Sequence, residues 1–274
     1  MQDMSLLPRL ELLYKKGELS DNERNAFLNG ILREQMSIFS YEDLVNIGME
    51  PLGKDNIKRF LYFVKKHKIN EIIASSFNKA RSLINQEHLH IRYFLLPLNP
   101  RIKFYTDFMD GMLAHTDSKN IIYIYLNTEI EIDFKKLESL CFHEFQHVLR
   151  NKYQNRGNVK LLDVVIDEGL SENFVGLYLG PDRIGRWANY QPLKKCLKDI
   201  DMFLNERNTN NPLKINEIMR GNTRNVPLWY GYSLGYYIVK DVTKKYNFID
   251  LIKMDTDELF SKSYFKELVG NYNE

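Results

Sequence analysis

Two histidines and a glutamate are spaced in a way that could build a hydrolytic metal centre. The segment His143-Glu144-Phe145-Gln146-His147 has the pattern H-E-x-x-H. On a helix, residues four apart lie on one face, so both imidazoles could reach one metal ion from adjacent turns. Neutral imidazole suits zinc. Glu144 would lie beside that ion, where a carboxylate can act as the base for a water molecule.

The residues around this motif favour a buried helix. Leu140, Cys141 and Phe142 stand before it, Val148 and Leu149 follow it, and none of them is charged. Histidine is scarce, with six residues in 274. A chain of this composition would show the pattern by chance in roughly 1 case of 100. The competing interpretation is a pair of histidines and a glutamate on a helix surface or in a polar core, with no metal.

A catalytic zinc ion normally has three protein ligands and one position open to water. The residues alone leave two sources for the third ligand. Glu168 follows His147 by 21 residues, which leaves room for a helix end, a loop and a returning helix. Glu172, one turn further on, could accept the outer N–H of a ligating imidazole. The other source is a third histidine such as His115, although the extended metzincin pattern is absent.

Three segments of the chain resemble a known family. Residues 143–150, 161–170 and 231–238 are similar to the YjaZ-like group of predicted zinc-dependent proteases, and the resemblance covers residues 88–245. A more distant resemblance is to the gluzincins, in which two histidines and a downstream glutamate hold zinc. The resemblance implies a zincin-like peptidase with one Zn²⁺ per chain and a peptide or protein substrate. It implies His143, His147 and Glu168 as ligands, Glu144 as general base and Glu172 as a supporting carboxylate.

The same resemblance suggests where substrate would bind. Gluzincins pair extended substrate with an edge strand upstream of the zinc helix, and Met112, Leu113 and Ala114 are the candidates for that strand. An ordinary sheet strand is an equal alternative. Tyr232 and Tyr236 share one helix face and are candidate donors to the oxyanion of the reaction. Close aromatic packing is the alternative role for these tyrosines.

The hydrophobic pattern predicts the elements that would position these groups. Helices are expected in the first 85 residues, with a capping box at Ser20–Glu23, a further start at Ser40–Asp43, and runs at 55–68 and 71–84. Strands are expected at 90–96, 111–115 and 120–126, with a turn at Asp110-Gly111. Helices follow from 133, then at 160–178, 193–204 and 228–244, with a loop at 205–212. We therefore predict an α+β protein with a helical N-terminal region (1–85) and a zincin-like catalytic domain (86–274).

Composition narrows the function classes. The 38 basic and 36 acidic residues leave a net charge of +2, which gives no reason to bind nucleic acid. Two cysteines, Cys141 and Cys196, do not make a disulfide framework, and Cys141 is expected to be a small core residue. We find no secretion signal and no apolar run of membrane-spanning length, so a cytoplasmic protein is expected. The sequence defines no oligomeric state.

Zinc-dependent peptidase is therefore the leading hypothesis. One alternative is a sensor or interaction module whose zinc is not catalytic. Such a structural site is closed by four protein ligands, and the sequence offers three. Another alternative is a zinc hydrolase that acts on a non-peptide amide, which the sequence does not separate from a peptidase.

Overall fold

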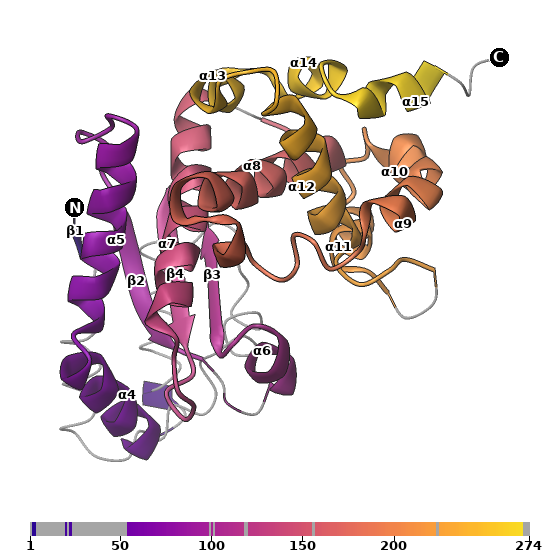
Figure 1. Ribbon diagram of the computed structural model, residues 1–274. Helices are drawn as coiled ribbons and strands as arrows, with labels where there is room; N and C mark the ends of the chain where they lie inside the picture. Colours follow the sequence, from indigo (N-terminus) through magenta and orange to yellow (C-terminus); the bar gives the residue numbers. More distant parts are fainter. Residues whose placement is uncertain are drawn as a thin grey trace. The chain divides into compact units, whose positions relative to one another are not determined.

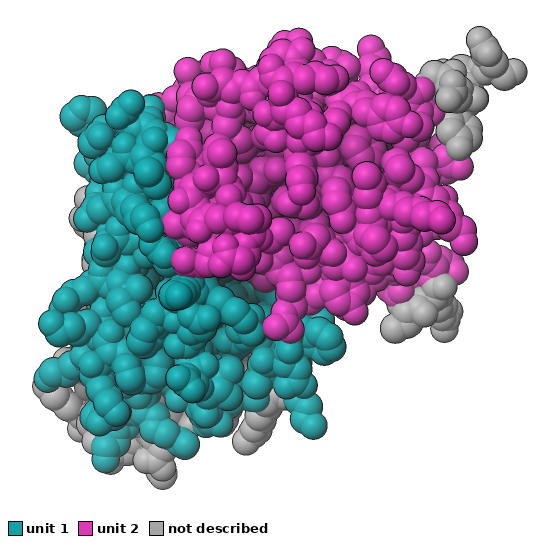
Figure 2. Space-filling model, viewed as in Figure 1, with its two compact units in different colours: residues 1–148 teal, residues 149–274 magenta. Residues whose placement is uncertain are grey.

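The computed structural model describes residues 2–3, 20, 22–23 and 54–270, apart from 99, 101, 118–119, 155–156 and 223–224. The chain divides into two compact units, Met1–Val148 and Leu149–Glu274, shown in teal and magenta in Figure 2. Their boundary falls inside one long helix, α7 (Phe134–Tyr153). The domain boundary predicted between residues 85 and 86 lies within the first unit and stays a prediction.

A small mixed sheet organises the first unit (Figure 1). Its strand order is β1-β2-β4-β3, with β4 parallel to β2 and antiparallel to β3. The strands are β1 (Gln2–Asp3), β2 (Arg92–Pro97), β3 (Met112–Thr116) and β4 (Ile121–Leu126). The three longer strands confirm the predicted ones. Among the described strands, β3 forms one edge of the sheet.

Strand β4 is buried along its whole length, as its continuous apolar sequence predicts. The turn into β3 is also as predicted, since Asp110 and Gly111 both have positive φ angles, of 52° and 69°. Glycine adopts that region without steric cost, and aspartate tolerates it better than most residues. A Cβ atom at position 111 would also lie 2.5 Å from the Ile130 side chain.

Three helices accompany the sheet and α7 in the described part of the first unit. The predicted helices at 55–68 and 71–84 are confirmed, whereas the short helix before β3 was not predicted. Phe77 packs its ring 6.0 Å from that of Tyr93 on β2, which places the second of these helices against the sheet. The three are α4 (Lys54–Lys66), α5 (Ile69–Leu83) and α6 (Lys103–Phe108).

The second unit is helical. Two of its helices, α8 and α12, approach closely at Gly169 and Gly235, where a Cβ atom on either glycine would lie 2.2 Å or less from backbone oxygen of the other helix. Asn173 strengthens this contact by donating to the carbonyl oxygens of Gly169 and Tyr236. The helices are α8 (Leu161–Leu179), η2 (Pro181–Arg183), α9 (Leu193–Lys198), α10 (Ile200–Glu206), α11 (Pro212–Arg220), α12 (Tyr230–Val242), α13 (Phe248–Lys253), α14 (Thr256–Ser261), η3 (Tyr264–Lys266) and α15 (Glu267–Gly270).

One predicted helix, 193–204, is in fact two helices, because the chain leaves helical geometry at Asp199. The buried Tyr230 hydroxyl oxygen lies 3.2 Å from Cys196 O and 2.9 Å from Asp199 O, and so occupies the point where the helix is interrupted. The predicted helices at 160–178 and 228–244 are confirmed within two residues as α8 and α12. The helix α11 and the last four helical segments of the chain were not predicted; these four are α13, α14, η3 and α15.

The N-terminal prediction is tested at one point. Ser20 Oγ accepts from the backbone N–H of Glu23 at 3.3 Å, and the Ser20 N–H donates to the Glu23 carboxylate at 3.0 Å. These two bonds are the predicted capping box. The helix start predicted at Ser40–Asp43 lies outside the described residues.

The predicted α+β class is confirmed, since helices and one small sheet form separate stretches of the chain. In the described part of the chain, no helix combines the length and the apolar character that crossing a bilayer requires.

Candidate metal centre

The H-E-x-x-H motif lies on α7, as predicted. Asp133 begins this helix by accepting the backbone N–H of Lys135 at 2.8 Å. Residues 141–146 are buried, which agrees with the uncharged flanks of the motif. His143 and Glu144 are 6% and 2% exposed, whereas His147 is half-buried. The helix therefore holds His143 and Glu144 away from solvent and leaves His147 partly accessible.

The two imidazoles converge. Their Nε2 atoms lie 3.1 Å apart, and the rings meet edge to face. Two nitrogen ligands ~2.0–2.1 Å from one zinc ion at a tetrahedral angle are about 3.3 Å apart. The observed separation is close to that value, so the pair fits a shared metal ion. Without metal, the same distance suits an N–H···N hydrogen bond between one protonated and one bare nitrogen.

Glu144 is held by a residue of the edge strand. Thr116 Oγ1 lies 2.7 Å from Glu144 Oε2 and 3.3 Å from the Glu144 carbonyl oxygen. A hydroxyl has one hydrogen, and the shorter contact identifies the carboxylate as its acceptor. The sequence analysis missed Thr116, because nothing in a strand ending in threonine indicates which distant side chain it meets.

The hydrogen bonds of β3 show which backbone groups face away from β4. The Asn127 N–H donates to Gly111 O, and the Asp117 N–H donates to Ile121 O, so each of these two pairs makes one backbone ladder bond. In an antiparallel ladder such pairs alternate along the strand. The N–H and C=O groups of Ala114 and Thr116 and the C=O group of Met112 are consequently directed to the outer edge of the sheet, whereas the Met112 N–H donates to Met109 O at 2.9 Å. Of the predicted substrate-binding residues, Ala114 presents both backbone groups there, Met112 presents its C=O, and Leu113 directs its groups to β4.

His115 points away from α7. Successive side chains of a strand lie on opposite faces, and the Thr116 side chain lies on the α7 face, where it meets Glu144. The His115 ring stacks on that of Tyr123, its partner on β4, with centroids 4.8 Å apart and planes 12° apart. Burial lowers the pKa of His115 to about 3. His115 is therefore not placed to join His143 and His147, and the third-histidine alternative loses its support.

The proposed third ligand lies on α8 in the second unit. Glu168 is half-buried, and Glu172, one turn later, is buried. Glu172 Oε2 accepts the backbone N–H of Gly185 at 2.7 Å. This bond ties the segment after α8 to the helix, and it is a partner that the sequence analysis did not foresee. The predicted contact of Glu172 with a ligating imidazole stays a prediction.

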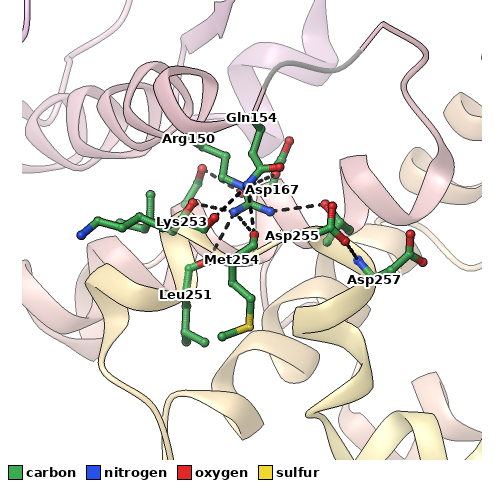
Figure 3. Close-up of polar contacts among 11 residues, drawn as sticks. Arg150, Gln154, Asp167, Leu251, Lys253, Met254, Asp255 and Asp257 are labelled. Atoms are coloured by element: carbon green, nitrogen blue, oxygen red, sulfur yellow. Dashed lines mark hydrogen bonds and ion pairs between the residues drawn. The ribbon is translucent and has the colours of Figure 1, made fainter.

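A buried arginine links the end of α7 to the rest of the second unit. The side chain of Arg150 is 1% exposed, and its Nε lies 3.2 Å from Asp167 Oδ1 on α8. Figure 3 shows its guanidinium surrounded by acceptors from α13 and the start of α14. The remaining acceptors are the carbonyl oxygens of Leu251, Ile252 and Met254 and the hydroxyl of Thr256. Arg150 thus fixes the last turns of α7 against α8 and α13.

Comparison with known proteins agrees with this chemistry. Residues 69–261 match the model of a family described as "Predicted Zn-dependent protease (DUF2268)". The chain belongs to this family. It is also 19% identical over 206 residues to the "Uncharacterized protein YjfC" of Bacillus subtilis (strain 168), a match that covers 69% of this chain and 68% of the relative. No solved structure matches the chain.

Within this family member, the two candidate oxyanion donors differ in environment. Tyr232 is half-buried on the first turn of α12. Tyr236 is 7% exposed, and its hydroxyl oxygen accepts from Lys240 Nζ at 3.2 Å. A hydroxyl oxygen that accepts a bond keeps its own hydrogen for donation, so this contact is compatible with a role as donor. Both roles remain predictions.

Cys141 has the predicted core role. Its side chain is fully buried, and burial raises the pKa of its thiol far above the usual range. A thiol of that kind is a poor nucleophile, since the thiolate is the reactive form.

Proposed function

We propose that this protein is a zinc-dependent peptidase in which His143, His147 and Glu168 hold one zinc ion and Glu144 is the general base. The observation that carries the proposal is the pair of Nε2 atoms 3.1 Å apart on α7 with the buried Glu144 carboxylate between them in sequence. Among the described residues, these two histidines and Glu168 are a group that could hold a metal ion. The family description supports the same metal and reaction class.

The choice of Glu168 is supported by the Arg150 contact. Arg150 follows His147 by three residues, so the two are neighbours on the surface of α7. Asp167, the partner of Arg150, immediately precedes Glu168 on α8. Within the second unit, the residue next to Glu168 is therefore tied to the C-terminal end of α7. We therefore expect Glu168, and not a carboxylate from another element, to complete the ligand set.

The reaction would use each group of the chain in a separate role. Bound zinc would supply a Lewis acid that polarises the scissile carbonyl and acidifies a water molecule. Glu144 would remove a proton from that water and deliver it to the leaving amine. The outer edge of β3 would hold extended substrate by backbone hydrogen bonds at the C=O of Met112 and at the N–H and C=O of Ala114. Tyr232 or Tyr236 would donate to the oxyanion that develops.

The buried position of Glu144 favours catalysis over a purely structural zinc site. Glu144 is 2% exposed, so its carboxylate is costly to desolvate, and the role of general base would give this buried group a function. Glu144 is also not placed to be a fourth zinc ligand beside His143 and His147, because it is adjacent to His143 in the sequence and adjacent residues point in different directions around a helix.

The test compares Glu144→Gln with the wild type. Both proteins should contain about one zinc ion per chain by mass spectrometry of metals, while cleavage of fluorescein-labelled casein by the variant falls by about 10²–10⁴-fold. Glu138→Gln is the matched control, because Glu138 lies on the same helix and pairs with Lys79 at 2.8 Å. Its activity should match the wild type.

Full activity in Glu144→Gln would overturn the peptidase mechanism. A wild type that holds zinc but cleaves neither casein nor a peptide library would favour the sensor or the non-peptide hydrolase. A wild type that binds no zinc after reconstitution would remove the metal centre itself.

A further inference from the structure

The side chain of Thr116 connects the edge strand β3 with Glu144. We infer that Thr116 is a positioning residue that sets the orientation of the Glu144 carboxylate relative to a substrate bound on β3. This inference deepens the proposed function and rests on it. The observation behind it is the 2.7 Å hydrogen bond from Thr116 Oγ1 to Glu144 Oε2, which joins residues 28 positions apart.

The backbone and the side chain of Thr116 have different tasks. Its N–H and C=O are directed to the outer edge of the sheet, because the neighbouring Asp117 makes the backbone bond to Ile121 on β4 and the bonded positions alternate along the strand. Its side chain leaves the strand on the α7 face and ends at Glu144. One residue thus carries both the backbone groups that extended substrate would meet and the donor that orients the base.

The bond restricts a carboxylate that would otherwise rotate. The terminal torsion of a glutamate side chain is broad, so burial alone does not orient its two oxygens. A donor on Oε2 restricts the rotation of the carboxylate about this last torsion. A general base must lie within hydrogen-bond reach of the proton that it removes, so its orientation limits the rate. A substrate that pairs with β3 would therefore meet a base already aligned with the strand.

The role predicts a separation of kinetic effects. Thr116→Val keeps the shape of the side chain but removes the donor, whereas Thr116→Ser keeps the donor and removes a methyl group. With labelled casein, kcat of Thr116→Val should fall about 10–100-fold while KM changes less than about twofold, because the backbone edge remains. Thr116→Ser should recover most of the wild-type kcat. Thr243→Val is the matched control, since the Thr243 hydroxyl bonds only within its own helix end, to Lys240 O.

A second readout does not depend on activity. Protein labelled with ¹³C at the glutamate Cδ and freed of metal shows one carboxyl signal per glutamate, and the signal lost in Glu144→Gln identifies Glu144. We expect this signal to shift in Thr116→Val and to stay at the wild-type position in Thr116→Ser and Thr243→Val. Thermal unfolding of each variant shows that the fold is retained.

The outcomes separate the two hypotheses. An unmoved Glu144 signal in Thr116→Val, or a kcat equal to the wild type, would overturn the role of Thr116. A parallel change of kcat, KM and unfolding temperature in both Thr116 variants would also overturn it, since it would show a structural effect. If the signal shifts as expected but the wild type cleaves nothing, the contact stands and the peptidase proposal is what fails.

Discussion

Arg150 and Asp167 join the helix of the histidine pair to the helix of Glu168, with Nε and Oδ1 3.2 Å apart. The side chain of Arg150 is 1% exposed, whereas the side chain of Asp167 is 18% exposed. Three carbonyl oxygens and a threonine hydroxyl accept the rest of its donors. A charge is stable in such a place only when nearly all its donors are satisfied.

Replacing this arginine should be costly. Arg150→Met removes the donors and leaves the Asp167 carboxylate and several carbonyl groups without them, so we expect the free energy of unfolding to fall by about 3–5 kcal/mol. Asp167→Asn keeps the shape and should cost about 1–3 kcal/mol. Glu217→Gln is the control, because the partly exposed Lys214–Glu217 pair should contribute less than about 1 kcal/mol. Urea denaturation followed by circular dichroism measures the free energy of unfolding of all three variants. A value for Arg150→Met within about 1 kcal/mol of the wild type would contradict a stabilising role of the Arg150 contacts.

Removal of individual ligands tests the metal centre. The affinity for zinc should fall by more than about 100-fold in His143→Ala and in Glu168→Ala, because each removes one of three protein ligands. Competition with a zinc chelator measures the affinities, and Glu138→Gln is the variant expected to keep wild-type binding. Loss of zinc in His143→Ala but not in Glu168→Ala would leave the histidine pair in place and assign the third ligand to another residue.

The contact between α8 and α12 should not tolerate a methyl group. A Cβ atom at Gly235 would lie 2.0 Å from Val165 O, and the backbone of two helices would have to separate to admit it. We expect Gly235→Ala to lower the free energy of unfolding by about 1–3 kcal/mol. Gly157→Ala is the matched control, since a Cβ atom there has no neighbour within 4 Å among the described residues. Equal stability of the two variants would show that the helices separate freely.

His115 should make the fold sensitive to acid. Its folded pKa of about 3 lies below the unfolded value of 6.5, so the unfolded chain takes up the proton first. The stabilisation from the neutral ring is complete above pH 6.5 and is lost as the pH falls towards 3. At pH 5 this loss is about 1–2 kcal/mol.

The test compares the wild type with His115→Phe, which keeps a ring to stack on Tyr123. The free energy of unfolding of this variant should fall less between pH 7.5 and pH 5. In the control variant His88→Phe, at an exposed position, the free energy of unfolding should depend on pH as it does in the wild type. If His115→Phe and the wild type lose stability in parallel, His115 does not take up a proton on unfolding in this range.

Much of this protein is determined locally by its sequence. The spacing of His143 and His147 brings both imidazoles to one face of any helix, and the uncharged flanks bury that helix. The run from Ile121 to Leu126 is apolar throughout and forms the buried strand β4. The turn at Asp110-Gly111 follows from residues that accept a positive φ angle. These features depend on residues that are close together in the sequence, so a local sequence pattern is enough to predict them.

Contacts between distant residues were decided by the tertiary structure alone. The strand register sends Thr116 to Glu144 and His115 to the opposite face, and a register shifted by one residue would exchange them. The helix predicted at 193–204 is interrupted at Asp199, where the hydroxyl of the distant Tyr230 meets its carbonyl oxygen. In the sequence, Arg150 looks like an ordinary charged residue of a helix surface. Its acceptors on α13 lie about 100 residues further along the chain. Packing chooses these partners because burial makes an unsatisfied polar group costly, and no local pattern states which distant group will satisfy it.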